Sequence, residues 1–337
     1  MTHIINREIH LINRPTGLPT EDDFKLVETA VPEIIEGEIL VRNSYMSVDP
    51  YMRGRMNDVE SYVPPFALNQ PLEGGCVGKV VQSKSDRFQE GDVVQGFLGW
   101  REYFTSKGSG LTRVDPALAP IQAYLGPLGM TGTTAYFGLL DIGRPKSGET
   151  VFVSAASGAV GSIVCQIAKI KGCYVVGSAG SGPKIGWLLT EAGVDKAINY
   201  KETKDLVAEV GKNCPNGIDV YFENVGGVHL AAALEHMNPF GRISLCGLIS
   251  TYNAVRPPRW PASMIYILTK RLTMKGFIVG DFFDRYPEFQ AEMGKWLQEG
   301  RIKWKETIVE GIEKAPKAFL GLFTGENIGK MIVKIGP

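Results

Sequence analysis

A glycine-containing turn at residues 154–161 has the residue types and the spacing to bind a phosphate group. Its sequence is SAASGAVG, and it lies between an apolar, β-branched segment and a segment with apolar residues at helical spacing. Gly158 would let the chain turn tightly beside a pyrophosphate, and Gly161 would let the following helix pack close to a sheet. The N-terminus of that helix offers N–H groups and a partial positive charge. The turn varies the G-x-G-x-x-G pattern, with Ala156 where a first glycine often sits, and in this context it predicts a dinucleotide site.

The residues after the next expected strand indicate which dinucleotide binds. An NAD site places Asp or Glu about 20 residues beyond the turn, where the carboxylate bonds the ribose 2′-hydroxyl. Residues 177–184 contain no acid and instead supply small residues, hydroxyls and Lys184. Since Lys184 could pair with a 2′-phosphate, the sequence predicts NADPH/NADP+ as the cofactor.

The histidines do not have the spacing of a metal site. Zinc catalysis requires Cys, His or carboxylate ligands that converge on one ion. His3 and His10 lie near the start of the chain, while His229 and His236 would stand about 10 Å apart along one helix axis. We therefore expect no metal site, and the absence of a G-x-S-x-G elbow disfavours an α/β-hydrolase.

Alternating strands and helices would position the turn. A helix is expected at 131–140, and six short apolar strands follow at 150–154, 174–176, 197–199, 218–222, 242–245 and 274–279. This pattern predicts a doubly wound parallel sheet. The first third has short strands punctuated by Gly and Pro, and the tail returns to strand, helix and strand. We expect an α/β protein with a discontinuous β-rich domain, residues 1–125 and 300–337, and a cofactor domain, residues 126–299.

Composition narrows the class of protein. The chain has 337 residues, 44% of them apolar, which is enough for two cores. Lys plus Arg equals Asp plus Glu at 36 each, so no net field favours nucleic acid or an anionic membrane. No apolar run reaches the roughly 18 residues of a membrane span, and no secretory signal is visible. The five scattered cysteines suit a reducing compartment, so we expect a soluble, cytoplasmic protein.

Several longer motifs carry a family resemblance. They are SVDPYMRGRM at 47–56, GMTGTTAY at 129–136, the turn at 154–161, ENVGG at 223–227, CGLISTYN at 246–253 and GENIGK at 325–330. With these motifs the chain resembles, nearly end to end, the zinc-free medium-chain dehydrogenase/reductases. The similar branch contains prostaglandin reductases, plant alkenal double-bond reductases and bacterial curcumin reductases. Zinc-dependent relatives carry Cys where this chain has SVD at 47–49, and Gly-His-Glu where it has LEG at 72–74.

The resemblance implies a GroES-like catalytic domain that binds the substrate, a Rossmann domain that binds NADP, and a homodimer that pairs near residues 271–279. It also implies the residues that contact the cofactor. These are Gly158, Ala159, Val160, Gly161, Lys184, Tyr200, Asn224, Cys246, Gly247, Leu248, Ile249, Ser250, Thr251, Tyr252, Phe277, Ile278, Val279 and Asn327.

The activity that the resemblance implies is NADPH-dependent reduction of the C=C double bond of α,β-unsaturated ketones or aldehydes. Hydride delivered to the β-carbon leaves negative charge on the carbonyl oxygen, and a positioned donor there lowers the barrier. Tyr252 is the best candidate for that donor, with the α-carbon protonated by Tyr252 or by water. Tyr51 and Tyr62 would line the substrate side of a largely apolar pocket.

Two alternatives remain open from the sequence. One is an NADPH quinone reductase of the same fold, and the other is an NADPH-binding protein without turnover. NADPH consumption with an enone, with a quinone and with no substrate separates the three.

Overall fold

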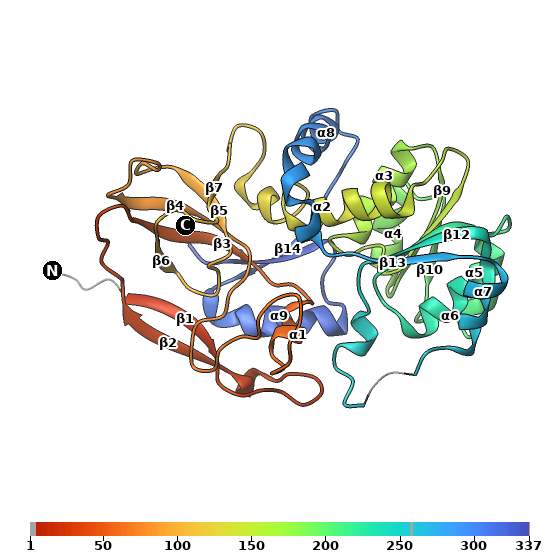
Figure 1. Ribbon diagram of the computed structural model, residues 1–337, viewed down its shortest axis with the longest axis horizontal. Helices are drawn as coiled ribbons and strands as arrows, with labels where there is room; N and C mark the ends of the chain where they lie inside the picture. The colour runs from red at the N-terminus through yellow and green to blue at the C-terminus, as the bar shows by residue number, and fades with distance from the viewer. Residues whose placement is uncertain (1–4, 257–258, 337) are drawn as a thin grey trace. The chain divides into compact units, whose positions relative to one another are not determined.

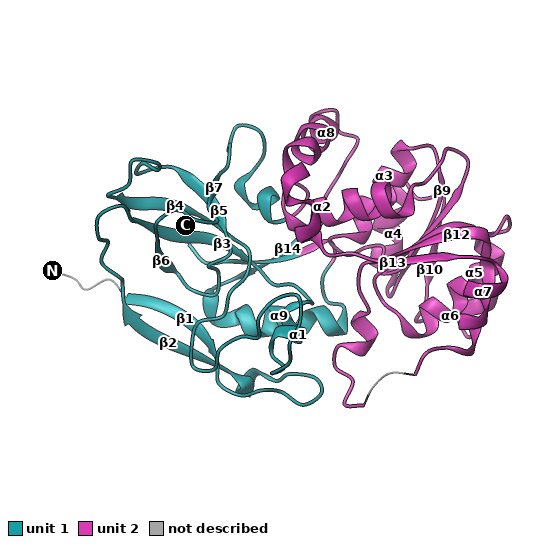
Figure 2. Ribbon diagram, viewed as in Figure 1, with its two compact units in different colours: residues 1–125, 306–327, 331–337 teal, residues 126–305, 328–330 magenta. Residues whose placement is uncertain are grey.

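Two compact units make up the computed structural model, which describes residues 5–256 and 259–336 (Figure 2). Unit 1 comprises residues 1–125, 306–327 and 331–337, and unit 2 comprises residues 126–305 and 328–330. Residues 300–305 and 328–330, which the sequence analysis assigns to the first domain, cluster with unit 2.

Unit 2 is built on a parallel sheet of six strands. The strands are β8 (Thr150–Val153), β9 (Tyr174–Ala179), β10 (Lys196–Asn199), β11 (Ile218–Glu223), β12 (Met237–Leu245) and β13 (Thr273–Gly276). Their order is β10-β9-β8-β11-β12-β13, and every neighbouring pair is parallel. This is the doubly wound order in which the chain reverses its direction of travel between β8 and β11. The expected fold class is confirmed, and ligands of such sheets bind at the carboxyl edge beside the reversal.

Helices cover both faces of this sheet (Figure 1). They are α2 (Met130–Phe137), α3 (Gly161–Ile170), α4 (Gly182–Thr190), α5 (Leu206–Asn213), α6 (Gly227–His236), α7 (Ile265–Thr269) and α8 (Tyr286–Gln298). The helices α2 and α3 lie on one face, while α5, α6 and α7 lie on the other (Figure 1). Shorter elements are the π-helix η3 (Gly138–Gly143) and the 3-10 helices η4 (Ile249–Thr251), η5 (Ala262–Met264) and η6 (Val279–Arg285).

Two strand boundaries in unit 2 differ from the sequence expectation. β12 starts at Met237 rather than at residue 242, because the chain already pairs with β11 before Phe240, a residue with a φ of 65°. The last strand ends at Gly276 rather than at residue 279, because Val279 already begins η6. At the first place Asn238, Pro239 and Gly241 interrupt the hydrophobic pattern although the strand has already begun, and at the second the pattern continues after the strand has ended.

Unit 1 contains two sheets, both formed by antiparallel pairs where the register is described. The small sheet pairs β1 (Ile5–Leu11) with β2 (Phe24–Ala30). The larger sheet has the order β14-β15-β3-β4-β5-β7, with β6 paired to β3. Its strands are β3 (Ile39–Ser47), β4 (Cys76–Ser83), β5 (Val93–Gly96), β6 (Tyr103–Ser106), β7 (Thr112–Arg113), β14 (Glu306–Glu310) and β15 (Lys330–Lys334). The short helix α1 (Met52–Arg55), α9 (Ala315–Thr324) and the 3-10 helices η1 (Glu21–Asp23), η2 (Ile121–Leu125) and η7 (Ile312–Lys314) complete the unit.

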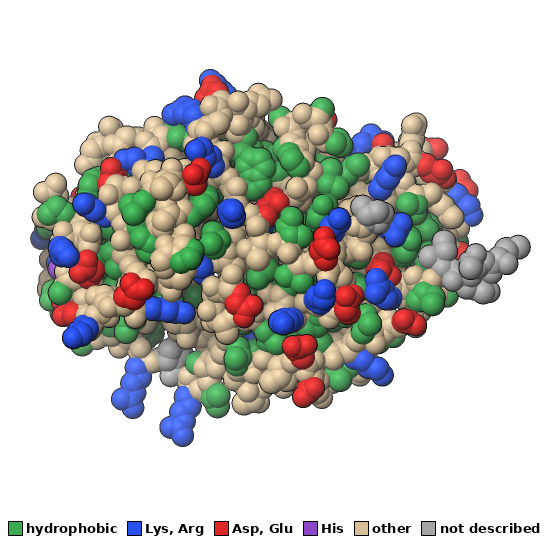
Figure 3. Space-filling view, turned by 180° about the vertical axis from the view of Figure 1, so that it is seen from behind, with side chains coloured by type: hydrophobic (Ala, Val, Ile, Leu, Met, Phe, Trp, Pro, Cys, Tyr) green, Lys and Arg blue, Asp and Glu red, His purple; other side chains and the backbone are tan. Residues whose placement is uncertain are grey.

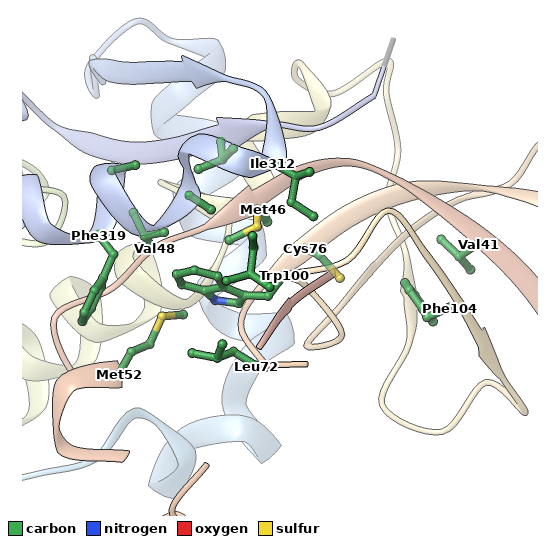
Figure 4. Packing of buried hydrophobic residues seen from close by; sticks show 14 of the residues in the cluster. Val41, Met46, Val48, Met52, Leu72, Cys76, Trp100, Phe104, Ile312 and Phe319 are labelled. Carbon is green, nitrogen blue, oxygen red and sulfur yellow. The ribbon is translucent and has the colours of Figure 1, made fainter. Parts of the chain in front are cut away.

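The core of unit 1 is centred on Trp100, which is fully buried (Figure 4). Its indole stacks on Phe24 with ring centroids 6.1 Å apart and meets the edge of Phe319 at 6.3 Å. Phe319 comes from α9, so the C-terminal tail supplies part of the apolar surface that unit 1 buries. Such aromatic pairs add about 0.5–1.5 kcal/mol each beyond the area that they bury.

The face shown in Figure 3 carries charges of both signs, with Lys and Arg side chains interspersed among Asp and Glu. The chain as a whole has 36 residues of each sign. Among the described residues, no helix is long and apolar enough to cross a membrane.

Candidate functional site

The turn between β8 and α3 leaves backbone donors available for an anion. The N–H groups of Ala159, Val160 and Gly161 have no hydrogen-bond acceptor within the described ranges, while Ser162 N–H already bonds to Gly158 O at 3.0 Å. These donors lie at the start of a ten-residue helix, where the helix dipole adds positive potential. The turn therefore fits a pyrophosphate.

Glycine is required at one position of this turn and leaves open space at another. A Cβ at Gly161 would lie 2.4 Å from Ala155 O, so any side chain there would displace the turn. A Cβ at Gly158 would have only one neighbour within 4 Å, Ala155 O at 3.2 Å, so Gly158 leaves its outer face clear for a ligand. Ala155 itself adopts a φ of 47°, which shows that an alanine bears the left-handed part of the turn.

A segment from the C-terminal tail braces the same turn. Gly329 N–H donates to Ser157 O at 2.7 Å, and Gly158 and Gly329 form a parallel β-bridge. A Cβ at Gly329 would lie 1.9 Å from Lys305 O, so only glycine fits there. Sequence reasoning missed Gly329, although it selected Asn327, two residues earlier in the GENIGK motif.

Asn224 is bound to the turn through its side chain and its backbone. Its Nδ2 donates to Ser154 O at 2.7 Å, and its backbone N–H donates to Ser154 Oγ at 2.8 Å. Ser154 Oγ in turn donates to Glu223 Oε1 at 2.8 Å, inside a fully buried pair. Burial raises the pKa of the Glu223 carboxyl. This network joins the ends of β8 and β11, where the sheet order reverses.

At the ends of β9 and β10, the Tyr200 ring lies beside the backbone of Gly180, and Lys184 follows four residues later. A Cβ at Gly180 would lie 3.1 Å from the Tyr200 hydroxyl oxygen. Lys184 lies in the first turn of α4, and both burial and the nearby Lys201 lower the pKa of its ammonium group. Lys201 did not figure in the sequence analysis.

His229 packs against Ser178 and Tyr200 at the ends of β9 and β10. Its Nε2 lies 3.1 Å from Ser178 Oγ, and its ring meets the edge of the Tyr200 ring with centroids 4.8 Å apart. The side chain is 2% exposed, and burial lowers the pKa of His229 to about 4. His229 is therefore a neutral packing residue at pH 7.

The loops after β12 and β13 line a hollow of about 500 Å³. The lining residues are Leu245, Cys246, Gly247, Leu248, Thr251, Tyr252, Gly276, Phe277, Ile278 and Asp281. Seven of them are expected cofactor contacts. Ile249, Ser250 and Val279 are not among them.

Asp281 is a lining residue that sequence reasoning missed. Its Oδ2 accepts a hydrogen bond from Ile278 N–H at 3.2 Å, which stabilises the start of η6. Phe277 also differs from a simple contact residue, since it is 8% exposed and its ring packs against Phe222 and Phe282. Phe277 therefore fixes the loop through its ring.

Tyr252 is held by its own loop. Its hydroxyl oxygen accepts a hydrogen bond from Leu248 N–H at 3.3 Å and lies 3.0 Å from the position of a Cβ on Gly247. A hydroxyl that accepts an N–H keeps its own proton as a donor, and the accepted bond polarises that O–H group. The arrangement suits a donor to a developing negative charge.

The two tyrosines expected on the substrate side lie in unit 1. Tyr51 immediately precedes α1 and is largely buried, and burial together with Asp49 raises the pKa of its phenol. Tyr62 is 61% exposed and close enough to contribute to the same shift. Asp49 accepts a hydrogen bond from Ser47 Oγ, both side chains being buried. Their role in binding a substrate stays a prediction.

Neither segment where zinc-dependent relatives carry ligands forms a metal cluster. Ser47 and Asp49 bond to each other, and Glu73 pairs with Arg55 at 2.8 Å. In residues 5–256 and 259–336, no group of three or more His, Cys, Asp or Glu residues could hold an ion.

Comparisons with known proteins match both parts of the chain. A family model described as the N-terminal domain of oxidoreductase matches residues 7–114, and one described as zinc-binding dehydrogenase matches residues 159–298. The NADPH-dependent curcumin reductase of Escherichia coli is 44% identical over 335 residues, covering 98% of this chain and 97% of that protein.

Two further relatives agree. The 2-alkenal reductase (NADP(+)-dependent) of Nicotiana tabacum is 44% identical over 337 residues, covering 98% of each chain. The crystal structure of CurA from Vibrio vulnificus in complex with NADPH superposes with a TM-score of 0.94 at 44% identity, covering 98% of this chain and 99% of that one.

Proposed function

This chain belongs to the medium-chain dehydrogenase/reductases, in the branch of the curcumin, alkenal and prostaglandin reductases, and we propose that it reduces the C=C double bond of α,β-unsaturated ketones and aldehydes with NADPH. The observation that carries the proposal is the carboxyl edge of the unit 2 sheet. There the phosphate turn and the Tyr252 hollow occur in a chain that is 44% identical to an NADPH-bound structure.

The residues of unit 2 fit NADPH at three places along this edge. The three N–H groups at Ala159–Gly161 suit the pyrophosphate, and Lys184 with Tyr200 suits the 2′-phosphate of the adenosine. The hollow beside Tyr252 suits the nicotinamide end. Asn224 would act by holding the turn, and Ile249 and Ser250 by holding the loop.

When bound, NADPH supplies the hydride that reduces the β-carbon of the enone. Tyr252 would donate a hydrogen bond to the carbonyl oxygen, directly or through the ribose 2′-hydroxyl, as negative charge develops there. Its Leu248 N–H partner fixes the direction of that donor before the reaction, so little reorganisation is needed. The proton for the α-carbon comes from Tyr252 or from water.

Tyr51 and Tyr62 of unit 1 are the proposed substrate-side residues. Their rings offer apolar faces for a hydrophobic or aryl enone. Asn327 is proposed to contact the cofactor, since it directly precedes the 328–330 segment that pairs with the turn.

The proposal also covers the cellular location and the oligomeric state. We place the protein in the cytoplasm, which suits its five free cysteines. We also propose a homodimer, supported by β13, an edge strand of the unit 2 sheet whose outer backbone groups could pair with a second copy.

The test is NADPH consumption with a simple aryl enone, with a quinone and without substrate. The proposal predicts turnover with the enone and a saturated ketone as product. Consumption only with the quinone would assign a quinone reductase, and binding of NADPH without turnover would assign a non-catalytic protein.

A further inference from the structure

The strands β9 and β10 end side by side. Their last paired residues are Ala179 and Asn199, and Tyr200 N–H continues the ladder by donating to Ala179 O at 3.1 Å. Gly180 therefore faces the residues that follow β10. A Cβ built on Gly180 would lie 3.1 Å from both the Tyr200 hydroxyl oxygen and Lys201 Cε. The Lys201 stem thus lies back across Gly180, beside the Tyr200 hydroxyl.

Gly180 has a spatial reason for lacking a side chain. Its φ is not in the left-handed region, so the backbone conformation does not require glycine. Any larger residue would press on Tyr200 and Lys201 where their polar ends converge. Glycine here keeps that space clear.

A second lysine, Lys184, is close enough to Lys201 for their charges to interact. Repulsion from Lys201 is one of the causes, after burial, that lower the pKa of the Lys184 ammonium group. Lys201 Nζ has no carboxylate within 4.0 Å in the described part of the chain. The lysines that do form ion pairs there are Lys169, Lys171, Lys212, Lys295 and Lys303. Two neighbouring cations repel each other, and a bound anion would relieve that repulsion.

The charges of these groups indicate which anion would bind here. A phosphate monoester carries about −1.5 to −2 charges near pH 7, which matches two ammonium groups. The Tyr200 hydroxyl, which lies beside Gly180 as Lys201 Cε does, can donate a further hydrogen bond. The donors that suit a pyrophosphate lie elsewhere, at Ala159–Gly161, so a phosphate bound beside Gly180 would be a separate group.

We propose that Lys201 is a second cationic residue for the adenosine 2′-phosphate and that, with Lys184, it sets the preference for NADPH over NADH. This rests on the proposed function, because it takes NADPH as the cofactor of unit 2. Lys201 sets specificity and does not touch the reacting atoms, so its removal should weaken the binding of nucleotides that carry a 2′-phosphate and leave the binding of nucleotides without it unchanged.

The test compares Lys201→Met with Lys204→Met, the same substitution three residues further along the same loop. Calorimetry measures the binding of 2′,5′-ADP, which carries the 2′-phosphate, and of 5′-AMP, which lacks it. Lys201→Met should weaken the binding of 2′,5′-ADP by about three- to tenfold. This loss lies between the contribution of an exposed ion pair and that of a charge-assisted hydrogen bond. Binding of 5′-AMP should not change, and Lys204→Met should affect neither ligand.

The outcomes separate the two proposals. If wild type prefers 2′,5′-ADP and Lys201→Met leaves that preference intact, or weakens both ligands equally, Lys201 has no such role. If wild type binds the two nucleotides equally, the proposed NADPH preference itself is wrong. A Lys184→Met/Lys201→Met double variant should lose most of the preference while retaining 5′-AMP binding.

Discussion

The two ends of the cofactor edge in unit 2 are held by different physical means. At the end that we propose binds the adenosine, Lys184, Tyr200 and Lys201 are partly or largely exposed, and two of the three side chains are cationic. At the nicotinamide end, backbone hydrogen bonds attach the loop to the end of β11. Ile249 N–H bonds to Asn224 O at 3.1 Å and Ser250 N–H to Val225 O at 3.0 Å. We therefore expect the first end to select the cofactor and the second to fix the geometry of the Tyr252 donor.

Both ends depend on the turn between them, so its glycine should have the largest effect. Gly161→Ala places a Cβ 2.4 Å from Ala155 O. The clash should lower the free energy of unfolding by about 1–3 kcal/mol and weaken the binding of NADPH by roughly a hundredfold. Gly186→Ala in α4 is the control, because a Cβ there meets nothing within 4 Å. Denaturant unfolding and NADPH titration measure both variants. Equal behaviour of the two variants would contradict the role of the turn.

The adenosine end should be the more sensitive to acid. His229 has a pKa lowered to about 4 by burial, below the value of about 6.5 in an unfolded chain. A lowered folded-state pKa gives stability that is present above pH 6.5 and is lost as pH falls through 4. Linkage puts the loss between pH 7 and 4 at about 3 kcal/mol. His229→Gln cannot titrate, so its unfolding free energy should fall less over this range; parallel curves would exclude His229 as the cause.

At the nicotinamide end, removing one hydroxyl should slow the chemistry. Tyr252→Phe keeps the ring and removes the donor, so single-turnover reduction of a simple enone should slow by about ten- to a hundredfold. NADPH affinity should change little. The control is Tyr174→Phe. Tyr174 is the first residue of β9, at the amino edge of the sheet, and its hydroxyl donates to Asn213 O. An unchanged rate in Tyr252→Phe would move the search to Tyr51 and Tyr62.

The adenosine end should respond in affinity alone. Lys184→Ala should raise KM for NADPH about tenfold, because the substitution removes a charge-assisted hydrogen bond and such bonds contribute at least this much at the low end of their range. The kinetics with NADH should stay nearly unchanged. Lys196→Ala is the control, since this lysine is exposed at the opposite end of β10. Wild type that used NADH as well as NADPH would remove the basis for this assignment.

The smallest expected effect is that of a chelator. With Ser47 and Asp49 bonded to each other and Glu73 paired with Arg55, we expect full activity after prolonged EDTA treatment. Metal analysis should find well under one zinc per chain. Stoichiometric zinc, with activity lost on its removal, would show that a metal replaces the hydroxyl donor.

Features set by backbone chemistry could be predicted from the sequence. The strand–turn–helix pattern around Gly158 and Gly161 predicts the parallel sheet and its phosphate turn, because only a few residue types fit such a turn. The structure confirms the fold class, with the turn at the reversal of strand order. The cofactor contacts themselves stay predictions.

Contacts between residues that are far apart in the sequence could not be predicted from it. Lys201 faces Gly180 only because β9 and β10 end at the same level, and Asp281 lines the hollow only because η6 begins at Val279. Gly329 braces the turn through a bridge between segments about 170 residues apart. Periodicity reports burial along one element, and it carries no information about which loops converge.

The most direct test of the account follows the hydride. NADPH deuterated at the transferable C4 position is mixed with a simple aryl enone, and the product is examined by NMR and mass spectrometry. The account predicts a saturated ketone with one deuterium on the β-carbon, and the α-carbon takes its hydrogen from solvent. Deuterium on the carbonyl carbon of an allylic alcohol, or no turnover of the enone, would contradict it.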